Sequence, residues 1–245
     1  MGSIADAPVV SGNPFSTRGL GTGVDPLFLI YALIPNLVTM VTLIHTGEAN
    51  PGKPPHPHHH EVFPASRAGY LDNRFRRFLY RPYRLAERYV KPGSRVLDFG
   101  CGPGFFTREF ARRVGDSGTV IAVDLQEEML RILREKMERE GLMSRIMTHL
   151  CAPDTIGLPR EFEGTVDTAF ALFVVHEVPD SQKLFKEISS LLAPGGLFFY
   201  TEPLFVVSGR EFRGNLEKAE KAGLELVEQR HFFVNRAAVL RKVPC

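Results

Sequence analysis

Three glycines, each separated from the next by one residue, follow a short apolar run near the middle of the chain. Gly100, Gly102 and Gly104 come directly after the run that ends in Asp98-Phe99. Glycines let the backbone turn sharply and approach a ligand, whose negative group then meets free N–H donors at the start of the following helix. Asp124 ends the next apolar run, where a carboxylate is placed to accept both hydroxyls of a ribose. The spacing predicts a site for a nucleotide-type cofactor.

The position of the third glycine indicates which kind of nucleotide is bound. The nicotinamide fingerprint is G-x-G-x-x-G, and this chain has Phe105 where that motif has its third glycine. The third glycine of this loop, Gly104, comes one position early. A nicotinamide site is therefore disfavoured.

A second group of chemically useful residues follows later apolar runs. His176, with Glu177 beside it, comes just past the fourth strand, and Glu202 ends the next strand. Open α/β sheets bind ligands at this carboxyl edge, and histidine exchanges protons near neutral pH. His176 is a candidate acid, base or acceptor-orienting group, or a histidine that only holds its loop together. Glu202 is expected either to face the same ligand cleft at the carboxyl edge or to accept hydrogen bonds from backbone N–H groups as a structural cap.

Short β-rich runs and amphipathic helices alternate from residue 94 onward, and they are the elements that must position these residues. Strand-like runs and helical faces can be read from the apolar pattern. Ser208 with Glu211 forms a capping box that starts a helix. The last two runs are too close for a crossover helix, so they predict an antiparallel hairpin. The strands are expected at 95–99, 119–123, 166–175, 197–200, 224–233 and 237–243, with helical faces at 129–137 and 184–192. The repeat predicts a doubly wound, Rossmann-like parallel sheet.

Four stretches of this domain resemble the class I S-adenosylmethionine-dependent methyltransferases over roughly residues 66–243. They are VLDFGCGPG at 96–104, VIAVD at 120–124, DTAFALFVVHEVPD at 167–180 and LLAPGGLFFYTEP at 191–203. The resemblance implies a seven-stranded sheet with an antiparallel last strand and S-adenosylmethionine as the cofactor.

The family pattern also implies roles for single residues. Gly100, Cys101, Gly102 and Gly104 would form the cofactor loop, Asp98 would meet the cofactor's amino group, and Asp124 with Leu125 would meet the ribose side. An acidic residue shortly after the third strand often contacts the adenine. Asp154 has the matching spacing to Leu158-Pro159, whereas Cys151 lies at the expected strand end.

Methyl transfer from a sulfonium is an in-line displacement, so catalysis depends mainly on positioning, with a base needed only for a protonated acceptor. The chain lacks the proline-proline-aromatic motif of base-amino methyltransferases and the Pro-Cys pair of cytosine C5 enzymes. These absences leave a small-molecule acceptor.

The N-terminal third differs from this domain. Residues 1–25 read as a flexible segment, and 26–44 run without a charge for about 28 Å as a helix, which makes them a candidate transmembrane or membrane-associated helix. A buried helix or a signal peptide is the alternative. Residues 45–65 form a Pro/His-rich linker, and no metal site is expected there.

A basic, aromatic cap at 66–91 precedes the sheet and contains seven arginines. It would lie on an anionic membrane, cover the active site, or pack on the core with a solvated basic face. One arginine precedes 26–44, whereas five basic residues follow it at 53, 67, 74, 76 and 77. If the segment spans a membrane, this asymmetry predicts that the catalytic domain lies on the cytosolic face. The alternative is a cytoplasmic location.

The whole chain has 245 residues with 30 basic and 28 acidic side chains, an even balance that argues against nucleic-acid partners. Three cysteines without a C-x-x-C pair favour a reducing compartment. The leading hypothesis is a methyltransferase acting on a small, hydrophobic or membrane-resident acceptor. Two alternatives stay open, a soluble methyltransferase acting on a polar metabolite or metalloid, and a non-catalytic cofactor-binding interaction protein.

Overall fold

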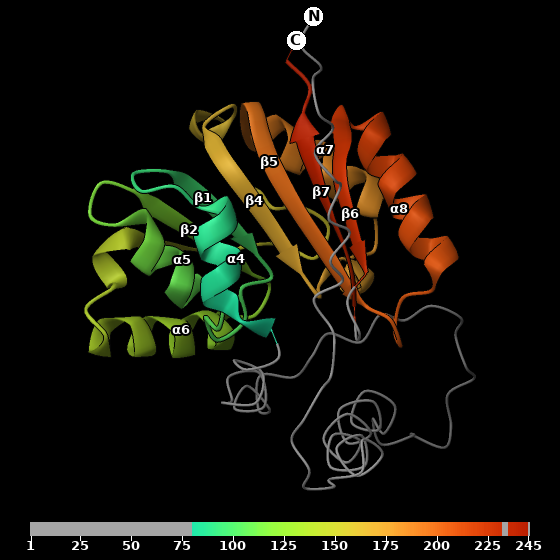
Figure 1. Ribbon diagram of the computed structural model, residues 1–245. Coiled ribbons are helices and arrows are strands. Elements are labelled where there is room, and N and C mark those ends of the chain that lie inside the picture. The colour runs from blue at the N-terminus through green and yellow to red at the C-terminus, as the bar shows by residue number, and fades with distance from the viewer. Residues whose placement is uncertain (1–79, 232–234, 245) are drawn as a thin grey trace, which may run out of the picture. The chain divides into compact units, whose positions relative to one another are not determined.

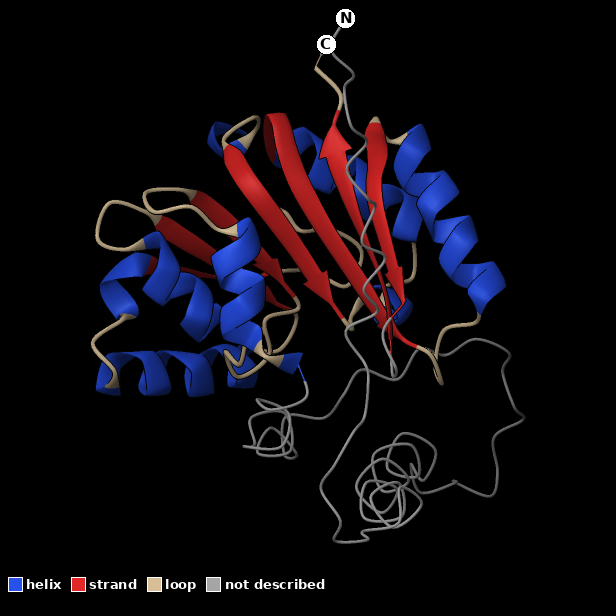
Figure 2. Ribbon diagram, viewed as in Figure 1, coloured by secondary structure: helices blue, strands red, loops and turns tan. Residues whose placement is uncertain are grey.

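The computed structural model describes residues 80–231 and 235–244 (Figures 1 and 2). The hydrophobic helix expected at 26–44, the segments 1–25 and 45–65, and residues 66–79 of the cap all lie outside these ranges. Within the described ranges, no helix combines the length and the apolar character needed to cross a membrane. The predicted N-terminal helix therefore stays a prediction.

Helices and strands alternate along the described chain, as the sequence pattern predicts. The elements are α4 (Pro82–Tyr89), β1 (Arg95–Phe99), α5 (Thr107–Val114), β2 (Thr119–Asp124), α6 (Glu127–Arg139), β3 (Ile146–Leu150), β4 (Val166–Leu172), α7 (Ser181–Leu191), β5 (Leu192–Pro203), α8 (Gly209–Lys221), β6 (Leu224–His231) and β7 (Asn235–Lys242). Short 3-10 turns include η4 (Val175–Glu177).

The strands form one seven-stranded sheet with the order β3-β2-β1-β4-β5-β7-β6. Neighbouring strands from β3 to β5 pair in parallel, whereas β7 pairs antiparallel with both β5 and β6. The Rossmann-like architecture, its antiparallel last strand and the C-terminal hairpin are confirmed for the described residues. The parallel strands bring the ends of β1, β2, β4 and β5 to one edge, which we call the carboxyl edge.

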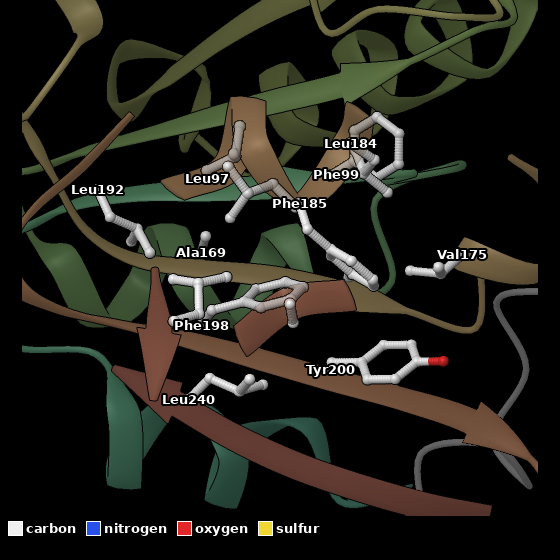
Figure 3. Packing of buried hydrophobic residues seen from close by; sticks show 14 of the residues in the cluster. Leu97, Phe99, Ala169, Val175, Leu184, Phe185, Leu192, Phe198, Tyr200 and Leu240 are labelled. Atoms are coloured by element: carbon white, nitrogen blue, oxygen red, sulfur yellow. The ribbon is translucent and has the colours of Figure 1, made fainter. Parts of the chain in front are cut away.

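Two buried cores lie on opposite faces of this sheet, because successive strand residues point to opposite sides. On one face, α4, α5 and α6 pack through residues such as Ala86, Phe110 and Leu133. On the other face, α7 and α8 cover a core that includes Leu97, Phe185, Phe198 and Tyr200 (Figure 3). The sheet is covered on both faces, as expected for near-continuous apolar strands.

Two helix starts follow the sequence signals. The Asp180 side chain accepts the Lys183 N–H at the start of α7, and the Ser208 side chain accepts the Glu211 N–H at the start of α8. Each cap satisfies one backbone donor that the helix itself leaves without a partner. The predicted helix after Ser208 is confirmed, with Gly223 just past its end.

Several predicted boundaries differ from the structure, and one strand was not expected. The strand expected at 166–175 ends at Leu172, because Phe173 turns the chain with φ 63 before η4. Leu192, expected at the end of a helix, already belongs to β5, which is longer than the predicted 197–200. The apolar pattern did not indicate β3, which lies at the edge of the sheet with mostly half-buried side chains.

The part of the cap that the structure describes packs against the domain. Pro82 occupies the first turn of α4, and Ala86 and Val90 are buried. The Tyr89 ring lies 5.2 Å from that of Phe199 on β5, and its backbone carbonyl accepts the Thr168 hydroxyl at 2.9 Å. Over this stretch the helix packs on the core, with its basic side chains on the outside.

Candidate active site

The three glycines after β1 form a tight loop at the carboxyl edge. Gly100, Gly102 and Gly104 have φ of 70, 53 and 84. Residues other than glycine rarely adopt this backbone conformation. A Cβ on Gly100 would lie 2.4 Å from Cγ2 of Val174 on the segment after β4. The Gly100 backbone therefore packs directly against this segment, and only glycine fits there.

Asp124 ends β2 and is tied to this loop. Its Oδ2 accepts the Gly102 N–H at 2.8 Å, and its Oδ1 accepts the Gln126 N–H at 2.9 Å. The carboxylate is 8% exposed, and burial raises its pKa above the usual range. Each oxygen of an ionised carboxylate has two lone pairs, so both can still accept a hydroxyl from a ligand.

Asp98 lies deeper, at the end of β1. It is 2% exposed, and burial raises its pKa to about 7 although the Thr107 hydroxyl donates to its Oδ2 at 2.6 Å. No ion pair involves Asp98 among the described residues. A buried carboxylate without a cationic neighbour is costly, so the position suits a ligand that brings a positive charge.

His176 and Glu202 come together at the same edge, as the sequence suggested. Their side chains meet through His176 Nδ1 and Glu202 Oε2 at 2.6 Å, and Glu202 Oε1 accepts the His176 backbone N–H at 3.2 Å. Glu202 is 1% exposed, so it orients the ring and also caps the turn η4. Of the two roles considered for this glutamate, the structure shows the capping of a backbone donor, and Glu202 reaches the carboxyl edge through its contact with His176.

Charge and burial act in opposite directions on this pair. Burial alone would lower the pKa of His176, but its hydrogen bond to Glu202 and the charge of this carboxylate raise the pKa above its ordinary value of 6.5. Burial also raises the pKa of Glu202. The imidazole is thus made more basic, while its other nitrogen, Nε2, lies 4.0 Å from Glu177 Oε1.

Known proteins resemble this domain in sequence. Residues 96–196 match the family model of a methyltransferase domain. The ubiquinone/menaquinone biosynthesis C-methyltransferase of Hydrogenovibrio crunogenus is 29% identical over 124 residues, which are 51% of this chain and 48% of that protein. The protein of the same name from Pasteurella multocida is 33% identical over 113 residues, 46% and 41% of the two chains. The chain spans about half the length of these relatives.

A solved structure agrees with the sequence relatives. An S-adenosylmethionine-dependent methyltransferase from Aquifex aeolicus superposes with a TM-score of 0.67 at 25% identity, over 74% of this chain and 100% of that one. The family model and this structure agree: residues 96–196 match a methyltransferase domain, and the described domain has the fold of an S-adenosylmethionine-dependent methyltransferase.

The residues of this methyltransferase domain fit S-adenosylmethionine. The buried carboxylate of Asp98 would meet the cofactor's ammonium group, and Asp124 retains lone pairs that would accept the two ribose hydroxyls. Cys101 is buried in the loop with its thiol toward the Gly102 carbonyl at 3.6 Å, and Leu125 is half-buried beside Asp124. Burial raises the pKa of the Cys101 thiol, in keeping with a packing role.

The two candidates for the adenine side are separated in the structure of the methyltransferase domain. Asp154 is exposed and forms an ion pair with Lys183 on α7 at 3.0 Å. The Cys151 N–H donates to the Asp124 carbonyl at 3.0 Å, so Cys151 is the one that adjoins Asp124, the predicted ribose ligand.

Two residues of this methyltransferase site were missed by sequence reasoning. Thr107 starts α5 and donates to Asp98, a contact that a threonine at a helix start could have signalled. Glu187 on α7 accepts the Ile156 N–H at 2.6 Å and so fixes the loop after β3. No local pattern indicates Glu187, because its partner is 31 residues away.

We expect Asp98→Asn to stabilise the cofactor-free methyltransferase at about pH 8 and to weaken cofactor binding. The folded state binds this proton more tightly than the unfolded chain, so stability falls as pH rises from about 4 to about 7. Asparagine keeps an acceptor for Thr107 without the buried charge. The gain in unfolding free energy is up to about 4 kcal/mol, measured by urea denaturation.

The pH dependence is the control for this expectation. Below about pH 3, where both folded and unfolded wild type carry the proton, the difference between the two proteins should disappear. Equal stability of Asp98→Asn and wild type at the higher pH would show that the buried carboxyl costs nothing.

Proposed function

We propose that this protein transfers a methyl group from S-adenosylmethionine to a small hydrophobic acceptor that carries an ionisable hydroxyl. The observation that carries the proposal is the His176–Glu202 pair, joined at 2.6 Å at the carboxyl edge. Its histidine lies two residues after Val174, which packs on the cofactor loop at Gly100. A base of raised pKa beside the cofactor suits an acceptor that arrives protonated.

In this proposal the residues of the chain bind, orient and move one proton. When bound, the cofactor supplies the methyl group and its sulfur keeps the electron pair of the broken bond. His176 accepts the acceptor's hydroxyl proton at Nε2, while Nδ1–H donates to Glu202. The electrons left on oxygen, or on a ring carbon conjugated with it, form the new bond to the methyl carbon. After attack at carbon, the hydrogen of that ring carbon leaves as a proton and the oxygen regains one, which restores the aromatic hydroxyl.

The relatives support the hydrophobic character of the acceptor. Both are named as C-methyltransferases of ubiquinone and menaquinone biosynthesis, so a quinol-like aromatic acceptor is the class to test first. The fold alone would not decide this chemistry. The [4+2]-cyclase SpnF shares the fold with a TM-score of 0.59 at 17% identity, over 89% of this chain.

We propose further that the acceptor is met at a membrane, with the domain on its cytosolic side. The support is the uncharged stretch 26–44 and the basic residues that follow it. Fractionation of the full chain tests this location. Recovery in the detergent-free soluble fraction would contradict it and favour a polar acceptor.

The test of activity is an acceptor panel with the full chain and methyl-labelled S-adenosylmethionine. A prenylated hydroquinone, the same ring without its prenyl tail, a catechol and a polar amine are compared. We expect labelled product from the prenylated hydroquinone, with the best kcat/KM of the panel. Label found only in polar products would overturn the hydrophobic acceptor, and no label in any product would favour a non-catalytic role.

A further inference from the structure

The connection from β5 to α8 displays apolar side chains to solvent. Phe205 is 61% exposed, the largest value among the exposed large apolar residues of the described chain, and Val206 is 37% exposed. The turn is held in place, since the N–H groups of Val206 and Val207 donate to the Pro203 carbonyl at 3.3 and 3.0 Å, and Val207 is buried. We call residues 204–208 the apolar turn. Its geometry holds Phe205 outward.

Arginines gather beside this apolar turn. Arg236 Nη1 donates to the Val207 carbonyl at 2.9 Å. A Cβ on Gly209 would lie 3.5 Å from Nη2 of Arg236 and 3.6 Å from Nη1 of Arg213, so both guanidinium groups adjoin the start of α8. Arg210 is exposed in the first turn of α8, and Glu211 is the acidic residue next to it. Helix starts already carry partial positive charge, so this cluster favours an anionic partner.

The apolar turn lies at the carboxyl edge, where the acceptor is handled. It begins two residues after Glu202, and the charge of Glu211 contributes to the raised pKa of His176. Figure 1 shows that α8 starts at the end of the sheet to which β4 and β5 point. Val243, which is 47% exposed, follows β7 at the opposite end because β7 runs antiparallel.

We propose that the apolar turn and its arginines dock on the surface of an anionic lipid bilayer. Phe205 and Val206 would enter the boundary between headgroups and acyl chains, and Arg210 and Arg213 would meet lipid phosphates. Apolar side chains rimmed by basic ones match such a surface in both polarity and charge. The inference rests on the proposed function and deepens it. Docking here would turn the carboxyl edge of the sheet toward a membrane-resident acceptor.

The chain contains no tryptophan, so a single one introduced by mutation reports on its own surroundings. We compare Phe205→Trp with Val243→Trp in the full chain, mixed with vesicles of phosphatidylcholine and phosphatidylglycerol that carry bromine on their acyl chains. We expect the tryptophan at 205 to shift to shorter wavelength and to lose most of its emission. The tryptophan at 243 should change little, even if another segment anchors the chain.

Charge is tested in the Phe205→Trp background. Arg210→Gln with Arg213→Gln, or vesicles of phosphatidylcholine alone, should leave most of the emission unquenched. Equal quenching at 205 and 243, or none at 205, would overturn the docking surface. Quenching at 205 that is equal with and without the two arginines would overturn the role of anionic lipid.

Failure of the docking surface and failure of the proposed function give different results. If only the docking surface is wrong, the panel still yields methylated hydroquinone while the tryptophan at 205 stays unquenched. If only the proposed function is wrong, the tryptophan is quenched but no acceptor gains label.

Discussion

Replacing His176 with glutamine is expected to lower kcat for a hydroxyl-bearing acceptor by about 10²- to 10⁴-fold. Glutamine is polar and of similar length, and it cannot accept the acceptor's proton. It can still hydrogen-bond to Glu202, the partner that His176 contacts at 2.6 Å. The affinity for S-adenosylmethionine should not change, because the cofactor residues come from β1 and β2. Initial rates and calorimetry measure the two quantities separately.

The matched control for this variant is Glu177→Gln. Its carboxylate lies 4.0 Å from His176 Nε2, on the side away from Glu202. We expect a much smaller loss of kcat there than at His176. A fall in cofactor affinity equal to the fall in kcat in His176→Gln would instead assign the histidine a structural role.

The same pair sets the pH dependence of methyl transfer. A base must be neutral to act, so kcat should rise as pH passes through the raised pKa of His176, above its ordinary 6.5. Glu202→Gln removes the charge that raises this pKa and should move the rise to lower pH. A rise at the same pH in wild type and variant would show that His176 is not the titrating base.

Asp124→Ala is expected to weaken S-adenosylmethionine binding by about 100-fold or more. A hydrogen bond to a charged group contributes about 1.5–3 kcal/mol, and this carboxylate is positioned to accept two ribose hydroxyls. The change also releases the Gly102 N–H, which donates to Asp124 at 2.8 Å. Isothermal titration calorimetry with S-adenosylmethionine measures the loss.

Asp116→Ala provides the comparison for Asp124→Ala. Asp116 carries the same charge, but its side chain is 90% exposed and pairs with Arg145 on the surface. Its loss should leave cofactor affinity unchanged. Equal affinities of wild type and Asp124→Ala would contradict the assignment of the cofactor site.

The sequence was sufficient to predict that the candidate cofactor residues lie together, because its signals there are local. Asp98 and Gly100 adjoin one another, and Asp124 ends the next predicted strand, so sheet geometry alone brings them together. The proximity of His176 and Glu202 was also predictable, since His176 follows β4 and Glu202 lies at the end of the neighbouring strand β5. Their distance and the second hydrogen bond to the His176 backbone were not, because they depend on the turn at Phe173.

Other features depend on packing that a single sequence does not reveal. The positive φ of Phe173 falls on a residue type that gives no turn signal. Asp154 has the expected spacing, yet Lys183 on α7 pairs with it at the surface. The edge strand β3 has few fully buried side chains, so its alternation is weak in the sequence.

One measurement tests the central claim most directly. The full chain is incubated with deuteromethyl S-adenosylmethionine and a quinol-containing lipid extract, and the organic phase is analysed by mass spectrometry. We predict a lipid product that carries one deuterated methyl group with wild type and is absent with Asp124→Ala. An organic phase without label, from a wild-type protein that binds the cofactor, would contradict the account.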